Sequence, residues 1–136
     1  MFKLFFATPD KKIIADAELE EITVPSYRGE LNILPGHAPL MTTLEAGILR
    51  YKLKSGESQK MAISWGYCQI SSDGVTVLAE TAVVGADLDI KVIEQHLKEN
   101  ENRLANESLD DVQWEKVQHE IGRLRAETDL LAEKTH

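Results

Sequence analysis

The period of the apolar residues divides the chain into two parts. Up to about residue 86, apolar and polar residues alternate at period two over short stretches, for example in 49–53, 61–65 and 75–79. Clusters of Gly, Pro, Ser and Asp, such as 26–29 and 71–74, separate these stretches. Short strands of this kind between turn clusters predict a β-sandwich or barrel with mostly antiparallel pairing.

After Gly85 the period of the apolar residues becomes helical. Asp87 or Asp89 is placed to cap the start of a first helix, and Ser108 with Asp111 resembles a capping box before a second helix. The apolar positions recur at spacings of three, four and seven, in a first stripe of Ile90, Ile93, Leu97 and Leu104 and a second of Trp114, Val117, Ile121, Leu124 and Leu131. This pattern predicts a two-helix hairpin over residues 87–136, after a β domain over residues 1–86.

The two apolar stripes are narrow, at about one residue per turn. Isolated helices of this kind are marginal in water and need a surface to lie on. We therefore expect the hairpin either to dock on the β domain or to open onto another protein.

Charge is distributed unevenly between the two parts. The net charge is −8; residues 1–86 carry 8 Lys and Arg against 10 Asp and Glu, whereas residues 87–136 carry 7 against 13. An acidic chain lacks the basic footprint that nucleic-acid binding needs. The lone Cys68 cannot form an internal disulfide and indicates a reduced compartment. No apolar run is long enough to span a bilayer or to serve as a signal peptide, so we expect no direct membrane span.

Residues 29–40, GELNILPGHAPL, contain the most unusual local chemistry of the chain. Pro35-Gly36 reads as the centre of a type II turn, and Pro39 adds a second stiff corner. We expect this segment to hold Glu30 and His37 in a rigid loop. A small hydrolase built around His37 and an acid is one interpretation, but no second histidine is near His37 in the sequence and no nucleophile arrangement is recognisable. A structural or contact role is therefore favoured, and neither a metal nor a cofactor is expected.

The chain resembles the epsilon subunit of the F-type ATP synthase, called delta in mitochondria. The resemblance rests on Gly29-Glu30-Leu31 followed by Pro35-Gly36-His37-Ala38-Pro39-Leu40, on the segment 44–50 (LEAGILR), and on the segment 75–82 (VTVLAETA). It continues into Asp87-Leu88-Asp89. Together these segments span most of residues 22–89.

This resemblance implies a ten-stranded flattened antiparallel β-sandwich and a C-terminal two-helix hairpin. It implies a non-catalytic rotor subunit of the central stalk, bound to gamma and seated on the polar loops of the c ring. Glu30 and His37 would then contact the c ring. It also implies a peripheral position on the cytoplasmic face of a bacterial inner membrane, or on the stromal face of a thylakoid.

In the family the hairpin either folds against the sandwich or extends along gamma into the alpha/beta head, where it blocks ATP hydrolysis. Basic side chains of the second helix make that contact, and the resemblance places Lys116, Arg123, Arg125 and Lys134 in this role. Some members also bind ATP through a motif that begins at the position of Leu88 and has Asp89 as its second residue. Here the Arg and Ala of that motif are Val92 and Ile93, which counts against ATP sensing.

One alternative from another class stays open at this point. A stand-alone ligand-binding β-sandwich with a helical dimerisation arm would show the same periodicities. It predicts a deep apolar pocket with convergent polar groups in the sandwich.

Overall fold

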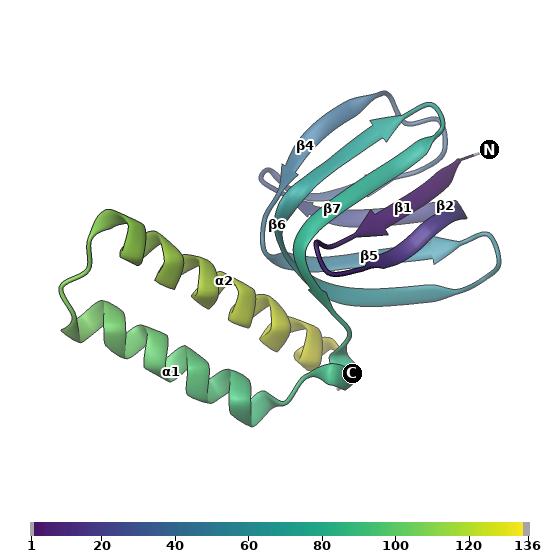
Figure 1. Ribbon diagram of the computed structural model, residues 1–136. Coiled ribbons are helices and arrows are strands. Elements are labelled where there is room, and N and C mark those ends of the chain that lie inside the picture. Colours follow the sequence, from purple (N-terminus) through teal and green to yellow (C-terminus); the bar gives the residue numbers. More distant parts are fainter. Residues whose placement is uncertain (1, 135–136) are drawn as a thin grey trace.

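The structure, a computed structural model, describes residues 2–134, which form seven strands followed by two helices (Figure 1). A 3₁₀ turn, η1 (Gly85–Asp87), joins the two parts. The helices are α1 (Ile90–Asn106) and α2 (Asp111–Lys134). The strands are β1 (Lys3–Ala7), β2 (Lys12–Ser26), β3 (Gly29–Ile33), β4 (Leu40–Leu44), β5 (Gly47–Leu53), β6 (Ser58–Ser71) and β7 (Gly74–Val83).

The strands close on themselves to form the predicted flattened sandwich. β6 pairs with β4, β5 and β7, and β2 pairs with β1, β3, β4 and β5, all antiparallel. β1 closes the sandwich by pairing with β2 on one side and, in parallel, with β7 on the other. The prediction of a mostly antiparallel sandwich is confirmed.

The described residues form seven strands, and the expectation of ten is wrong. Two strands are long, β2 with 15 residues and β6 with 14 residues. Each changes partner along its length: β6 pairs with β5 through residues 58–63 and with β4 through residues 66–70. β2 and β6 therefore each span a stretch that could otherwise be divided into shorter strands, which lowers the number of strands.

The sandwich has a complete core of its own. Inward side chains from the strands form one cluster, which includes Phe6, Ile22, Leu49 and Ile63, each at most 1% exposed. The residues of this cluster come from residues 4–82. The side chains of this cluster are therefore buried without help from α1 or α2.

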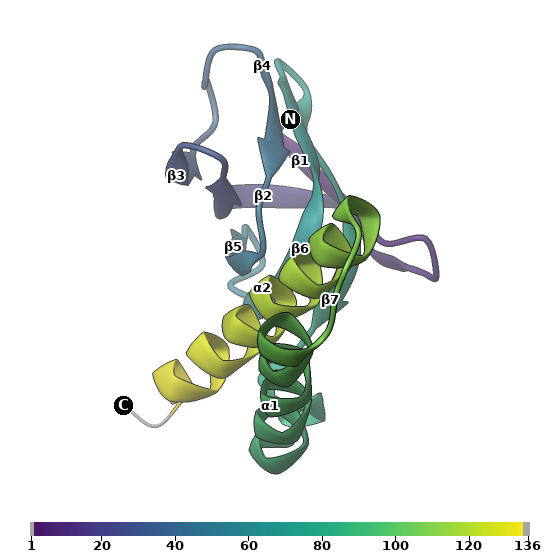
Figure 2. The ribbon, with the colours of Figure 1, turned by 90° about the vertical axis from the view of Figure 1, so that its left-hand side faces the viewer.

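The hairpin of α1 and α2 is folded back on the sandwich. α2 packs against β5 and β6 on one side and against α1 on the other, so it lies between α1 and the strands (Figures 1 and 2). Ile93, Val117, Ile121 and Leu124 of the predicted stripes are buried, whereas Trp114 is half exposed.

The helix starts are capped by aspartates. Asp89 caps α1, because its Oδ1 accepts a hydrogen bond from the Lys91 amide at 2.9 Å, as one of the two predicted caps. For α2 the predicted box of Ser108 and Asp111 is wrong. Instead Asp110 Oδ1 accepts from the Gln113 amide at 2.8 Å, and Gln113 Oε1 accepts from the Asp110 amide at 3.2 Å. Asp110 and Gln113 therefore form a reciprocal capping box, with the glutamine three residues after the N-cap residue, as the box requires.

Candidate functional site

The turn between β3 and β4 has the predicted type II geometry. Gly36 adopts φ +89°, and the His37 amide donates to the Leu34 carbonyl at 3.1 Å, which places Pro35 and Gly36 at the two central positions. The Nδ1 of His37 lies 2.7 Å from the Ala38 carbonyl oxygen, which can only accept, so Nδ1 carries the proton. In the neutral ring Nε2 is then an acceptor.

Glu30 and His37 do not share a loop, contrary to the expectation from the sequence. Glu30 lies on β3, opposite Pro25 of β2, whereas His37 follows the other end of the strand. The Glu30 side chain is 65% exposed, and His37 is partly buried. Large apolar side chains are also exposed beside this loop, namely Leu34, Leu40 and Met41. The segment thus offers both charged and apolar groups to a partner.

The contact between the hairpin and the sandwich is small and mixed in character. Its buried apolar members are Ala62 of β6 and Ala126 and Leu130 of α2, with Ile48 and Val83 packed beside them. Next to this cluster the ring of Trp65 stacks on the ring of His119, with 3.9 Å between centroids and 7° between planes. The neighbouring Gly122 leaves room for this stack, since a Cβ there would lie 3.1 Å from Cη2 of Trp65.

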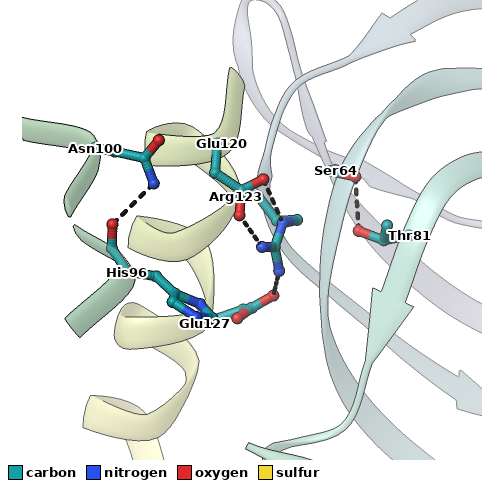
Figure 3. A network of polar contacts seen from close by, with 7 residues as sticks. All are labelled: Ser64, Thr81, His96, Asn100, Glu120, Arg123 and Glu127. Atoms are coloured by element: carbon teal, nitrogen blue, oxygen red, sulfur yellow. Dashed lines mark hydrogen bonds and ion pairs between the residues drawn. The ribbon is translucent and has the colours of Figure 1, made fainter. Parts of the chain in front are cut away.

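Arg123 is held by two carboxylates of its own helix (Figure 3). Its Nη1 donates to Glu127 Oε2 at 2.6 Å, and its Nε and Nη2 donate to the two carboxylate oxygens of Glu120. Burial lowers the pKa of Arg123, but the hydrogen bonds to Glu120 and the charge of Glu127 outweigh it and raise the pKa overall. Glu127 is 4% exposed, so Arg123 neutralises a carboxylate that is almost out of water.

Arg50 fastens the C-terminal end of α2 to the sandwich. From β5 its Nη1 and Nη2 donate to the two carboxylate oxygens of Glu133 at 2.5 and 2.8 Å. Lys60 of β6 lies 3.6 Å from the same carboxylate. The hydrogen bond from Arg50 and the charges of Arg50 and Lys60 lower the pKa of Glu133, against a smaller opposing effect of burial. Arg50 also lies 3.9 Å from Glu30 Oε1, so one guanidinium faces two carboxylates.

The four basic residues assigned to the second helix lie in different settings. Lys116 and Arg123 line one groove between α2 and strands β6 and β7, together with Trp65 and His119. Arg125 is exposed to solvent. The backbone of Lys134 ends α2, but its side chain lies outside the described part of the chain.

Three features of the described residues bear on whether the chain could be an enzyme or bind a ligand, namely its thiol, its potential metal ligands and its grooves. Burial raises the pKa of the Cys68 thiol to about 12, so it stays protonated. No group of three or more His, Cys, Asp or Glu side chains within residues 2–134 is arranged to hold a metal ion. One groove beside α2 is lined in part by Lys116 and Arg123, and another by Glu30, Glu45, Arg50 and Glu133. Both are open and lined by charged residues, unlike the deep apolar pocket that a ligand-binding sandwich predicts. Within the same residues, no helix is long and apolar enough to cross a membrane.

The sequence did not reveal the contacts that hold the hairpin. Arg50 and Glu133 are 83 positions apart, and Trp65 and His119 have no local pattern that pairs them. Arg50 belongs to the conspicuous segment 44–50, but nothing there indicates its partner.

Comparison with known proteins places these features in a family. Residues 1–85 match the family model described as ATP synthase, Delta/Epsilon chain, beta-sandwich domain. The chain is 44% identical over 128 residues to the ATP synthase epsilon chain of Bdellovibrio bacteriovorus, which covers 93% of this chain and 91% of that one. It is 38% identical over 121 residues to the epsilon chain of Geobacter sulfurreducens, covering 89% and 86%.

Among solved structures, the fold is similar to a chain of the Euglena gracilis mitochondrial ATP synthase, solved with OSCP, F1 and the c-ring. The TM-score is 0.81 at 21% identity, and the match covers 96% of this chain and 81% of that one. A chain of the Tetrahymena thermophila mitochondrial ATP synthase central stalk and c-ring matches with a TM-score of 0.68 at 13% identity, covering 96% of both chains. The chain therefore belongs to the family of ATP synthase delta/epsilon chains.

Proposed function

We propose that this chain is a non-catalytic rotor subunit in the central stalk of a proton-translocating F-type ATP synthase. In this role residues 1–86 bind the gamma subunit and the polar loops of the c ring, and they transmit rotation of the ring to the catalytic head. Residues 87–136 restrain ATP hydrolysis when they leave the sandwich and enter the alpha/beta head. The epsilon-chain relatives and the central-stalk setting of the two similar structures support this assignment.

One observation supports the regulatory part most directly. The sandwich core is complete without the hairpin, whereas the hairpin contact buries Ala62, Ala126 and Leu130 in a separate small cluster. The hairpin can therefore detach without exposing the main core. A switch needs two states within a few kcal/mol of each other, and a small contact of alanines, one leucine and ion pairs suits that requirement.

The proposed contact with the c ring uses Glu30 and His37. Glu30 offers an exposed carboxylate from a strand, and His37 offers Nε2 from a turn that Pro35 and Gly36 hold in place. Leu34 and Leu40 add apolar surface beside them. A contact that carries torque must keep its shape, and the two prolines restrict the backbone there.

A chain with this role sits at the membrane through its partners. We place it on the cytoplasmic face of a bacterial inner membrane, or on the stromal face of a thylakoid, without a membrane span or a cofactor of its own. Glu133 of α2 already binds Arg50 of the sandwich, and Asp89 already caps α1, so the chain is not expected to need ATP for the folded state.

Copurification tests the assembly part. A tagged chain is expected to bring down the gamma subunit and the membrane-bound c ring. Replacing both Glu30 and His37 by Ala should reduce this recovery and proton-coupled ATP synthesis, while the matched variant Glu45→Ala should not. A chain recovered alone as a soluble dimer would instead support the ligand-binding alternative.

ATP hydrolysis tests the inhibitory part. The assembled head is compared with the full-length chain and with a version truncated after Asp87. Faster hydrolysis with the truncated version is expected, and equal rates would remove the inhibitory role while leaving the rotor role intact.

A further inference from the structure

Arg50 is shared between the proposed contact with the c ring and the hairpin. Its guanidinium makes two hydrogen bonds to Glu133 of α2, and its Nη2 also lies 3.9 Å from Glu30 Oε1 on β3. The side chains of Arg50 and Glu133 are 36% and 32% exposed, so each is about two-thirds covered. Glu30, by contrast, is mostly in solvent and free to bind elsewhere.

We propose that Arg50 couples the two ends of the chain: engagement of Glu30 by a partner strengthens docking of the hairpin, and release of Glu30 weakens it. This inference rests on the proposed function for the identity of the partner at Glu30, which would be the c ring. The coupling itself is a property of the isolated chain.

The sign follows from competition for one guanidinium. Both Nη atoms of Arg50 donate to Glu133, whereas Glu30 Oε1 lies 3.9 Å from Nη2, beyond hydrogen-bond distance. Because the guanidinium is a rigid planar fork, a shift that brings it closer to Glu30 lengthens its bonds to Glu133. While Glu30 is free, its carboxylate draws Arg50 toward β3 and away from α2. When a partner binds Glu30, that competition ends and Arg50 interacts with Glu133 alone. A seated rotor therefore favours the folded hairpin.

The size of the effect on the docking equilibrium depends on how exposed Arg50, Glu30 and Glu133 are. Partly exposed ion pairs change an equilibrium by roughly 1.5- to 5-fold, so the coupling is a bias and not a lock. A bias of this size is useful only where the two states of the hairpin are nearly balanced. The small size of the apolar contact between α2 and the sandwich favours such a balance.

Amide hydrogen exchange of the full-length chain measures the docking equilibrium. Most of the stability of a helix in a protein comes from packing of its apolar face, and detachment uncovers the face that α2 turns to the sandwich, so the amides of α2 exchange mainly from the detached hairpin. Glu30→Gln imitates an engaged Glu30, because it removes the competing charge, and is expected to slow exchange of α2 by roughly 1.5- to 3-fold. Glu133→Gln is expected to speed it by roughly 1.5- to 5-fold.

The decisive comparison repeats Glu30→Gln in an Arg50→Met background. Sharing of Arg50 predicts that the effect of Glu30→Gln is lost there. If Glu30→Gln slows exchange as much or more without Arg50, the carboxylates merely repel each other and the coupling through Arg50 is wrong. The proposed coupling would also be overturned if Glu30→Gln, with Arg50 present, left the amide exchange rates of α2 unchanged.

Two controls complete the design. Glu45 lines the same groove as Glu30 and Glu133 but forms no ion pair among the described residues, so Glu45→Gln should leave exchange of α2 unchanged. Exchange of the buried β6 and β7 amides should be equal in all variants, which shows that the sandwich stays folded. Because no ring is present, this result is independent of whether Glu30 and His37 prove necessary for assembly.

Discussion

Trp65 on β6 and His119 on α2 form a parallel stack that joins the sandwich to the hairpin, with ring centroids 3.9 Å apart. Stacked aromatic pairs contribute about 0.5–1.5 kcal/mol beyond the area that they bury. Because this pair bridges the sandwich and the hairpin, its contribution goes to docking of the hairpin and not to the stability of either part alone.

We expect His119→Ala to weaken docking by about 0.5–1.5 kcal/mol, whereas His119→Phe keeps the stack and most of the stability. In a Trp114→Phe background Trp65 is the single tryptophan, so the fluorescence emission measures how far the Trp65 ring is exposed to water. His119→Ala should shift the emission of Trp65 to longer wavelength and speed amide exchange in α2. Equal exchange in the Ala and Phe variants would show that the stack contributes nothing.

Gly122 is expected to be a sensitive position for docking. In a free helix Gly122→Ala would add about 1 kcal/mol of stability from helix propensity. Here the added Cβ lies 3.1 and 3.2 Å from two carbons of the Trp65 ring, and the ring must move to admit it. We expect Gly122→Leu to detach the hairpin while the melting temperature of the sandwich is unchanged. Circular dichroism and the fluorescence of Trp65 measure the two effects separately.

The sequence alone placed both parts of the fold, because the change of apolar period at Gly85 is a local signal. It also predicted the turn at Pro35-Gly36, where the residue types dictate the backbone angles. The ten strands that the family resemblance implied were wrong, because β2 and β6 each continue as one strand while their partners change.

The contacts of the hairpin were largely out of reach of sequence reasoning. One local group is an exception: Glu120 and Glu127 lie three and four positions from Arg123, a spacing at which side chains of one helix meet, and the structure shows all three joined. The role of Gly122 depends on Trp65 of a distant strand, which no pattern around Gly122 shows. Long-range pairs such as Arg50 with Glu133 follow only from the docked geometry.

Docking of the hairpin is expected to weaken in acid. Arg50 and Lys60 hold the pKa of Glu133 below its ordinary value of 4.5. A group whose pKa is lowered by folding contributes stability above its unfolded pKa and loses it as pH falls through the folded pKa. The contribution is therefore complete above about pH 4.5 and declines below it. Exchange of α2 measured at pH 6 and near pH 3.5 should diverge more in the wild type than in Glu133→Gln.

The turn before His37 should tolerate asparagine better than alanine. Gly36 adopts φ +89°, where an L side chain is strained although no atom lies within 4 Å of the site of its Cβ. Gly36→Ala is expected to lower the free energy of unfolding of the sandwich by about 1 kcal/mol. Gly36→Asn should lose less, because asparagine enters the left-handed region more readily. Urea unfolding followed at Trp65 measures both, and equal losses would contradict this explanation.

Glu127 gives the sharpest test of the polar contacts in the hairpin. Its side chain is 5% exposed and its charge is balanced by Arg123, which Glu120 also binds. Removing one partner of a buried pair leaves the other charge uncompensated, so Arg123→Met should destabilise docking by about 1–3 kcal/mol. Removing both charges relieves that penalty, so Arg123→Met with Glu127→Met should recover most of the loss. Arg125→Met, on the same helix but exposed, serves as the matched control and should have no effect. If the double variant is as unstable as the sum of its single changes, the pair contributes through packing and not through charge, because additive losses are the signature of independent sites.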